Sequence, residues 1–213
     1  RPDANVSYMG LTCLDPSYEN QNNLSIYSEA GKQIDYYFIK GQNGDDVISG
    51  YRELTGKSPI MPKWAMGLWQ SRQRYKSQDE LVGVVKEYRK RNIPFDNIVL
   101  DWFYWPEDKW GDHDFNPEFW PNPEKMMEDI HAMNSHIMIS VWPKFYVGTK
   151  NYELFKEKGW LYMNNIELGN LDWVGKGYKN TFYDAYNPEA RKVFWEGMNE
   201  KLFSKGIDAW WMD

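Results

Sequence analysis

The stretch from Ser77 to Asp101, SQDELVGVVKEYRKRNIPFDNIVLD, combines a helix pattern with a strand pattern directly behind it. The apolar residues of its first part recur on one helical face behind a predicted Ser77 cap: Leu81, Val84, Val85 and Tyr88. The run NIVL at 97–100 is apolar and has the length of a buried strand, and an acidic residue follows it. The stretch therefore predicts one helix–strand unit of an α/β protein.

The same alternation extends in both directions along the chain. We predict strands in WAMGLWQ (64–70), NIVLDWF (97–103), HIMISVW (136–142) and IDAWWMD (207–213). We predict helices in 77–92, in 122–134 with Pro123 near its start, in 151–159 with Gly159 at its end, and in 187–206. Strands that alternate with helices predict a parallel sheet with crossover helices.

Two architectures contain such a sheet, a doubly wound open sheet and a (β/α)8 barrel. No glycine-rich G-x-G-x-x-G turn follows the first predicted strand, which disfavours a nucleotide-binding open sheet. A whole barrel typically takes ~250 residues. We therefore predict that residues 62–213 form the first four βα units, or half, of a (β/α)8 TIM barrel.

The first part of the chain has a different pattern. Residues 1–43 contain the β-type runs LSIYSEA (24–30) and IDYYFIKG (34–41) between loop signals, and we expect them to be the C-terminal part of an N-terminal β-sandwich domain. Residues 44–61 are expected to form a connecting helix and linker, with Asp45 or Asp46 as the N-cap and Gly56 at the helix end.

The composition excludes several classes of partner. A net charge of -6 with scattered basic residues gives no attraction for nucleic acid or an anionic membrane, and no apolar run has the length of a membrane span. One cysteine and three histidines provide no metal-ligand cluster, and we expect His131 on a helix surface and His136 in a loop. The sequence does not indicate a cellular compartment.

Aromatic residues make up 17% of the chain, with 12 tryptophans and 15 tyrosines. One interpretation is an aromatic-rich core. The other is a carbohydrate site, because flat aromatic faces stack on the apolar faces of sugar rings. In a barrel, chemistry occurs where strands end, and three predicted strands end in Asp101, in Trp142 and Lys144, and in Asp213. Any one acid there is also typical of a solvated loop or a helix cap, but together these groups favour an acidic, aromatic-walled pocket.

Several linked motifs carry a family resemblance. They are ISGYRELTGKSPIMPKWAMGLWQSR (48–72), VLDWFYW (99–105), FYDAYNPEARKVFW (182–195) and GIDAWWMD (206–213). In this order they resemble the retaining α-glycosidases of glycoside hydrolase family 31, over about residues 34–213. The run LDWFYWPEDKWGDHDF (100–115) is most similar to the α-xylosidase branch, whereas neighbouring branches hydrolyse α-glucosides on the same scaffold.

The resemblance implies roles for individual residues. Asp213 matches the catalytic nucleophile at the end of the fourth barrel strand, and Asp101 matches an aspartate that binds hydroxyls of the sugar in the cleaved subsite. Trp142 matches an aromatic wall of that subsite. Three further aromatics are expected along the same cleft, with a core role as the alternative: Trp69, Phe103 and Trp105.

Other residues near these motifs are expected to have structural roles. Trp210, Trp211 and Met212 are expected to hold the last strand in the core. For Asp184 we expect capping or structural hydrogen bonding. We expect 112–114 to be a solvated loop, and the alternative is a polar loop that reaches the aglycone.

The family's general acid/base lies well beyond the fourth strand, together with an arginine and a histidine that bind the sugar, and this sequence does not contain that region. We therefore expect a truncated piece of a retaining enzyme that acts on oligosaccharide or polysaccharide substrates without a metal or organic cofactor, and that is inactive by itself. The alternatives are an α-glucosidase of the same family and a non-catalytic carbohydrate-binding module.

Overall fold

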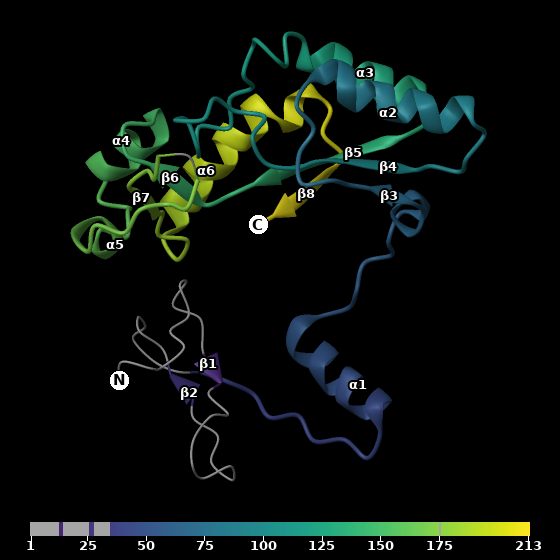
Figure 1. Ribbon diagram of the computed structural model, residues 1–213. Coiled ribbons are helices and arrows are strands. Elements are labelled where there is room, and N and C mark those ends of the chain that lie inside the picture. The colour runs from purple at the N-terminus through teal and green to yellow at the C-terminus, as the bar shows by residue number, and fades with distance from the viewer. Residues whose placement is uncertain (1–12, 15–25, 28–34, 175) are drawn as a thin grey trace. The chain divides into compact units, whose positions relative to one another are not determined.

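The computed structural model describes residues 13–14, 26–27, 35–174 and 176–213. The chain divides into two compact units, Arg1–Ile60 and Met61–Asp213, and each is described here by itself (Figure 1). Most of the predicted β-sandwich piece lies outside the described residues. The domain boundaries predicted at 43/44 and 61/62 stay predictions.

In the first unit, β1 (Cys13–Leu14) pairs antiparallel with β2 (Ile26–Tyr27). The strand predicted over 34–41 is wrong in its described part, since residues 35–41 have no regular structure.

The helix α1 (Gly44–Thr55) follows, and Gly56 ends it with a φ of 82° as predicted. Its N-cap is Asn43, not Asp45 or Asp46. The Asn43 side chain accepts the N–H of Asp46, while the Asp46 carboxylate accepts the N–H of Gln42. The Asp46 carboxylate thus accepts the N–H of the residue before the N-cap, which is a variant of the capping box.

The second unit is built on a four-stranded parallel sheet in the order β3-β4-β5-β8, as the strand and helix alternation predicted. The four strands are β3 (Trp69–Gln70), β4 (Asn97–Leu100), β5 (His136–Val141) and β8 (Ala209–Met212). His136 therefore begins a strand and is not the loop residue that we expected.

The first strand is shorter than predicted, because η1 (Lys63–Met66) is a 3-10 helix. The Asp96 carboxylate accepts the N–H of Leu68 at 3.1 Å, directly after the turn at Gly67. A Cβ on Gly67 would lie 2.0 Å from the same carboxylate oxygen, so a larger residue would displace the Asp96 side chain.

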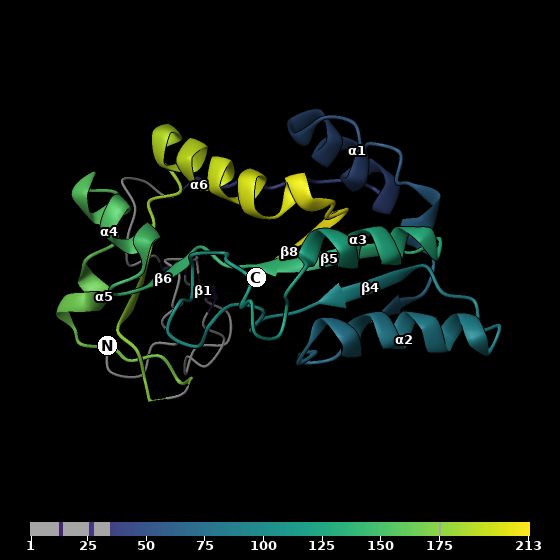
Figure 2. The same ribbon diagram turned by 90° about the horizontal axis from the view of Figure 1, so that it is seen from above.

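Three capped helices connect the strands: α2 (Gln78–Lys90), α3 (Pro123–Ala132) and α6 (Pro188–Lys201). Their N-caps are the side chains of Ser77, Asn122 and Asn187. Figures 1 and 2 show α2 and α3 side by side over one face of the sheet. In Figure 2, α6 lies on the side of α3 that is away from α2. The core of this layer consists of fully buried apolar residues from helices and strands: Leu81, Val85, Ile98, Leu100, Met126, Ile130, Ile137 and Ile139.

An insertion lies between β5 and α6, and the sequence pattern predicted only its helix over 151–159. It contains β6 (Lys144–Tyr146), α4 (Lys150–Glu157), α5 (Asn164–Glu167) and β7 (Asn180–Phe182). β6 pairs antiparallel with β7 in a separate two-stranded sheet. After α6, the short helix η2 (Phe203–Lys205) ends at Gly206, whose φ of 106° turns the chain into β8.

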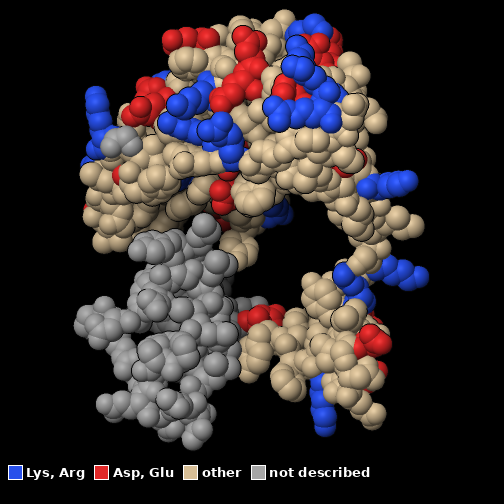
Figure 3. Space-filling view, turned by 45° about the vertical axis from the view of Figure 1, so that its right-hand side comes forward, with Lys and Arg blue, Asp and Glu red and all other residues tan. Residues whose placement is uncertain are grey.

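Lysine and arginine side chains are interspersed with aspartate and glutamate on the helix-covered side of the second unit (Figure 3). No helix among the residues that the structure describes is both long and apolar enough to span a membrane.

Candidate active site

Three strands of the parallel sheet end at one edge. In register, Leu100 of β4 pairs with Ile139 of β5, and Val141 of β5 pairs with Met212 of β8. The next residues along these strands are Asp101, Trp142 and Asp213. The structure thus brings two of the predicted carboxylates and one predicted aromatic wall to the same carboxyl edge, where barrel enzymes carry their chemistry.

Asp101 lies partly buried at this edge, and its Oδ1 accepts the N–H of Trp102 at 2.7 Å. Burial raises the pKa of the Asp101 carboxyl above its ordinary value, and the negative charge of Asp213 contributes in the same direction. The hydrogen bond from the Trp102 N–H opposes the rise in pKa. Two carboxylates that interact electrostatically across one edge form a site for groups with positive charge or hydroxyl donors.

Aromatic rings line the edge beside the carboxylates. Phe103 and Trp105 are nearly parallel, with ring centroids 6.3 Å apart, and Trp105 lies 5.0 Å from Trp110. Trp110 meets Trp142 edge to face at 5.2 Å. Phe103 and Trp142 are half-buried, whereas Trp105 and Trp110 are buried. Trp110 therefore joins three of the predicted site aromatics into one cluster, although the sequence analysis did not single it out.

Trp69 does not belong to this cluster. It pairs with Asn97, the first residue of β4, and therefore lies toward the amino edge of the sheet. Its indole N–H donates to the carbonyl oxygen of Ala65 at 2.9 Å, and its ring lies 6.0 Å from that of Trp64. With ~3.3 Å per strand residue, Asn97 and Asp101 are about 13 Å apart along the strand. The expected position of Trp69 at the carboxyl end of its strand is not what the structure shows.

The end of β8 is also less buried than expected. Trp210 is half-buried, but the exposed fraction of the residue surface is 49% for Trp211 and 68% for Met212. The reason is topological, since β8 is an edge strand of the described sheet. The expectation that all three residues are held in the core is wrong for Trp211 and Met212 in the described chain.

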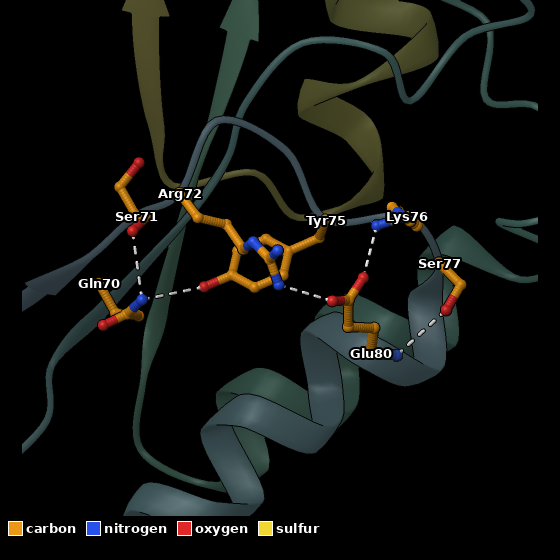
Figure 4. A network of polar contacts seen from close by, with 7 residues as sticks. All are labelled: Gln70, Ser71, Arg72, Tyr75, Lys76, Ser77 and Glu80. Atoms are coloured by element: carbon orange, nitrogen blue, oxygen red, sulfur yellow. Dashed lines mark hydrogen bonds and ion pairs between the residues drawn. The ribbon is translucent and has the colours of Figure 1, made fainter.

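The loop between β3 and α2 reaches the same aromatic cluster. Its Arg74 guanidinium carbon lies 4.7 Å from the centroid of Phe103, within range of a cation–π interaction. Figure 4 shows the polar contacts that hold this loop, in which Arg72 donates to Glu80 at 2.7 Å and Glu80 accepts the backbone N–H of Lys76 at 2.7 Å. A helix residue thus fixes the loop that carries the cation.

Lys144 lies behind Trp142 in an enclosed polar cluster. Its Nζ donates to Asp172 Oδ2 at 2.6 Å, and the hydroxyl of Tyr146 donates to the same oxygen at 2.8 Å. The sequence predicted Lys144 at a strand end. It did not predict the contact with Asp172, because the spacing of the two residues follows no helix or strand period.

The segment 112–114 is not the solvated loop that we expected. Only 2% of Asp112 and 2% of His113 are exposed. The Asp112 carboxylate accepts the backbone N–H groups of Lys150 and Asn151 at the start of α4. Burial lowers the pKa of His113 to about 4, with a smaller contribution from the positive charge of Lys201.

Asp184 has the structural role that we expected, since its side chain accepts the N–H of Tyr186 at 3.0 Å. His131 lies partly exposed at the end of α3, as predicted, and its Nε2 is 2.8 Å from an Asp208 carboxylate oxygen. Within the described part of the chain, no group of three or more acidic, histidine or cysteine side chains has an arrangement suited to a metal ion.

Comparisons with known proteins identify the family of this chain. The model of the glycosyl hydrolases family 31 TIM-barrel domain matches residues 58–213. An α-xylosidase of Saccharolobus solfataricus is 44% identical over 91% of this chain and 24% of its own length. An α-glucosidase of the same organism is 31% identical over 84% of this chain and 25% of its own length.

The crystal structure of the family 31 α-xylosidase from Xanthomonas citri is similar as well. It has a TM-score of 0.81 and 56% sequence identity, over 93% of this chain and 22% of that chain. The chain thus spans about a quarter of the length of the relatives that it matches. The predicted parallel α/β sheet of a TIM barrel is confirmed, and the chain belongs to glycoside hydrolase family 31.

Proposed function

We propose that the protein carrying this segment is a retaining α-glycosidase that releases terminal α-linked xylose. The observation that carries the proposal is the position of Asp213, one residue beyond β8, at the sheet edge that also bears Asp101 and Trp142. The similarity to α-xylosidases supports the xylose preference.

In the proposed reaction, an Asp213 carboxylate oxygen attacks the anomeric carbon as the glycosidic bond breaks. The departing oxygen receives a proton from a second carboxylic acid, and the sugar stays attached to Asp213 as an ester. Water then attacks the same carbon, the second carboxylate takes the proton of that water, and the ester bond breaks. Two inversions give net retention, and the reaction needs no metal or organic cofactor.

The other proposed roles follow from the edge geometry. Asp101 binds sugar hydroxyls through charge-assisted hydrogen bonds that strengthen as the ring flattens. Trp142 and Phe103 provide apolar walls, and Trp105 supports them from the buried side. We assign no general acid within residues 1–213, since in this family that residue is expected beyond the fourth strand.

A covalent trap tests the role of Asp213. The full-length protein, incubated with a 5-fluoro α-xylosyl fluoride, should accumulate a glycosyl ester because fluorine slows its hydrolysis. Peptide mass analysis should find the added mass on Asp213. Label on Asp101 would instead reverse the two roles, and a full-length protein that binds xylosides without releasing any aglycone would be a carbohydrate-binding module.

The similarity to an α-glucosidase favours a second candidate, an α-glucosidase on the same scaffold. The same trap with the corresponding glucosyl fluoride distinguishes the two activities by the relative rates of labelling. Both reactions use the same Asp213 chemistry, so this comparison tests the substrate and leaves the mechanism unchanged.

A further inference from the structure

Lys144 and Asp172 form an ion pair in the interior of the second unit. Their side chains are 6% and 3% exposed, and the Nζ–Oδ2 distance is 2.6 Å. Burial lowers the pKa of Lys144, whereas the hydrogen bond and charge of Asp172 oppose this change. Taking two charges out of water destabilises the folded state, and their attraction offsets this cost only with good geometry and further hydrogen bonds. An interior pair of this kind calls for a reason other than stability.

Its surroundings indicate what the pair does. The Lys144 ammonium lies 3.6 Å from the ring centroid of Trp110 and 4.8 Å from that of Trp142. These two rings meet edge to face at 5.2 Å. A desolvated cation over an indole face is attracted by the negative charge of the ring face. The ammonium therefore interacts with both rings at once.

The two indoles have no other polar anchor among the described residues. The ring N–H groups of Trp110 and Trp142 are buried and find no hydrogen-bond partner there. Their orientation thus depends on packing and on the ammonium. The negative charge of Asp213 also acts on Lys144, so the cation, the indole wall and the strand-end carboxylate lie within electrostatic range of one another.

We propose that Lys144 is a positioning residue that fixes the Trp142 indole at the edge beside Asp213. Asp172, which precedes β7 in the insertion, anchors the ammonium, and the Tyr146 hydroxyl holds the anchor. The insertion between β5 and α6 thereby sets the wall of the sugar pocket. This inference rests on the proposed function, since a wall matters only if sugar binds against it.

A double-mutant cycle in the full-length protein tests the inference. The variants are Lys144→Met, Trp142→Phe and the double variant, each assayed for kcat/KM on an aryl α-xyloside. If Lys144 acts through Trp142, Lys144→Met should lower kcat/KM about 10-fold in the wild type but no more than about 2-fold in the Trp142→Phe background. Equal losses in both backgrounds would overturn the proposal.

A second pair of variants keeps the test valid if Lys144→Met does not fold. Tyr146→Phe removes one hydrogen bond to Asp172 and leaves the ion pair intact. It should lower kcat/KM about 3-fold, and again only when Trp142 is present. Lys144→Arg retains the cation and should keep kcat/KM within about 3-fold of the wild type.

A matched control comes from the opposite edge of the sheet. Lys205, in the short helix before β8, pairs with Glu124 of α3. Lys205→Met should leave both kcat/KM and the near-ultraviolet circular dichroism of the tryptophans unchanged. Lys144→Met should change that spectrum, and the change should be smaller in the Trp142→Phe background.

The spectra separate the two hypotheses. Suppose that the wild type releases no aglycone, but that Lys144→Met changes the spectrum less in the Trp142→Phe background than in the wild type. The proposed function then fails, and the positioning of Trp142 by Lys144 stands. If the wild type is active but both the spectral and the kinetic effects are additive, only the positioning role of Lys144 fails.

Discussion

The backbone N–H of Asp213 donates to the carbonyl oxygen of Val141 at 3.1 Å. The ladder between β5 and β8 therefore continues one residue past the last strand pair, Val141 with Met212. Because Trp142 follows Val141 directly, the carboxylate and the indole leave neighbouring strands at the same level. Groups that are held by strand backbones keep their geometry better than groups on loops, as in-line attack on a sugar requires.

Asp101→Asn should separate activity from stability in the full-length protein. Asparagine keeps the acceptor for the Trp102 N–H but loses the charge that we propose binds sugar hydroxyls. A hydrogen bond to a charged group contributes about 1.5 to 3 kcal/mol, so kcat/KM on an aryl α-xyloside should fall about 10- to 100-fold.

The stability of the same variant should rise at neutral pH. Burial raises the folded-state pKa of Asp101, so ionisation disfavours the folded state once the pH exceeds the unfolded pKa of about 3.9. The melting temperature of Asp101→Asn should therefore exceed that of the wild type at pH 7, and the difference should disappear toward pH 3. A lower melting temperature at pH 7 would contradict this linkage.

Two tryptophans at opposite edges of the sheet should respond differently to truncation. Trp142→Ala removes a wall beside Asp213 and should lower kcat/KM about 10- to 100-fold, which corresponds to the burial of one aromatic face. Trp69→Ala removes packing against Trp64 and the indole donor to Ala65. Because Trp69 is only half-buried, the change should lower stability by about 3 kcal/mol, the low end of the range for a tryptophan truncation. The kcat/KM of Trp69→Ala should stay within about threefold of the wild-type value. A larger loss would show that Trp69 contributes to the site.

The sequence predicted the parts of the fold that depend on local patterns. Apolar runs and helical periodicity predicted the four strands and the helices between them, and the Ser77 cap followed from residue type. The carboxyl-edge positions of Asp101 and Asp213 followed from strand direction alone. These features depend on neighbours in sequence, where spacing is informative.

Features that depend on distant neighbours were missed. Lys144 and Asp172 meet across 28 residues of insertion, and no periodicity connects them. His113 looked like a loop residue in a polar run, but it packs against Phe194 of α6 at 5.4 Å. Trp69 was assigned to the wrong edge because η1 shortens its strand, and its register with Asn97 became clear only in three dimensions.

His113 should make the barrel segment sensitive to acid. Its pKa is lowered to about 4 by burial, whereas an unfolded histidine has a pKa of about 6.5. The unfolded state therefore binds a proton between these values while the folded state does not. This contribution to stability, about 3 kcal/mol, is complete above pH 6.5 and is lost as the pH falls to 4.

His113→Asn is the matched variant, because His113 has a φ of 56° and asparagine tolerates this left-handed conformation. It loses the contact with Phe194, so it should melt below the wild type at pH 7. The gap should narrow steadily as the pH falls from 6.5 to 4, since the variant has no imidazole to protonate. A gap that stays constant between pH 7 and pH 4 would show that His113 takes up its proton in the folded state.

The proposed xylose preference should appear as exclusion of glucose. The two sugars differ by one hydroxymethyl group at C5, and we propose that the Trp142 indole leaves no space for it. The full-length protein should therefore have a higher kcat/KM on an aryl α-xyloside than on the glucoside. The difference in activation free energy should exceed the ~1 to 3 kcal/mol that one methylene contributes to an apolar pocket. Trp142→Ala should lower the ratio of kcat/KM on the xyloside to kcat/KM on the glucoside. Equal efficiency on both sugars would favour an α-glucosidase and leave the family unchanged.

Residues 1–213, produced alone, should hydrolyse no aryl α-xyloside. A retaining enzyme needs two carboxylic acids about 5 to 5.5 Å apart on the two faces of the bond, and we assign only the nucleophile here. In the described sheet, β3 and β8 are edge strands, and Trp211 and Met212 at the end of β8 are 49% and 68% exposed. Unpaired edges and apolar surface promote association, so light scattering should find oligomers. Turnover within about tenfold of the full-length protein would mean that residues 1–213 contain the general acid.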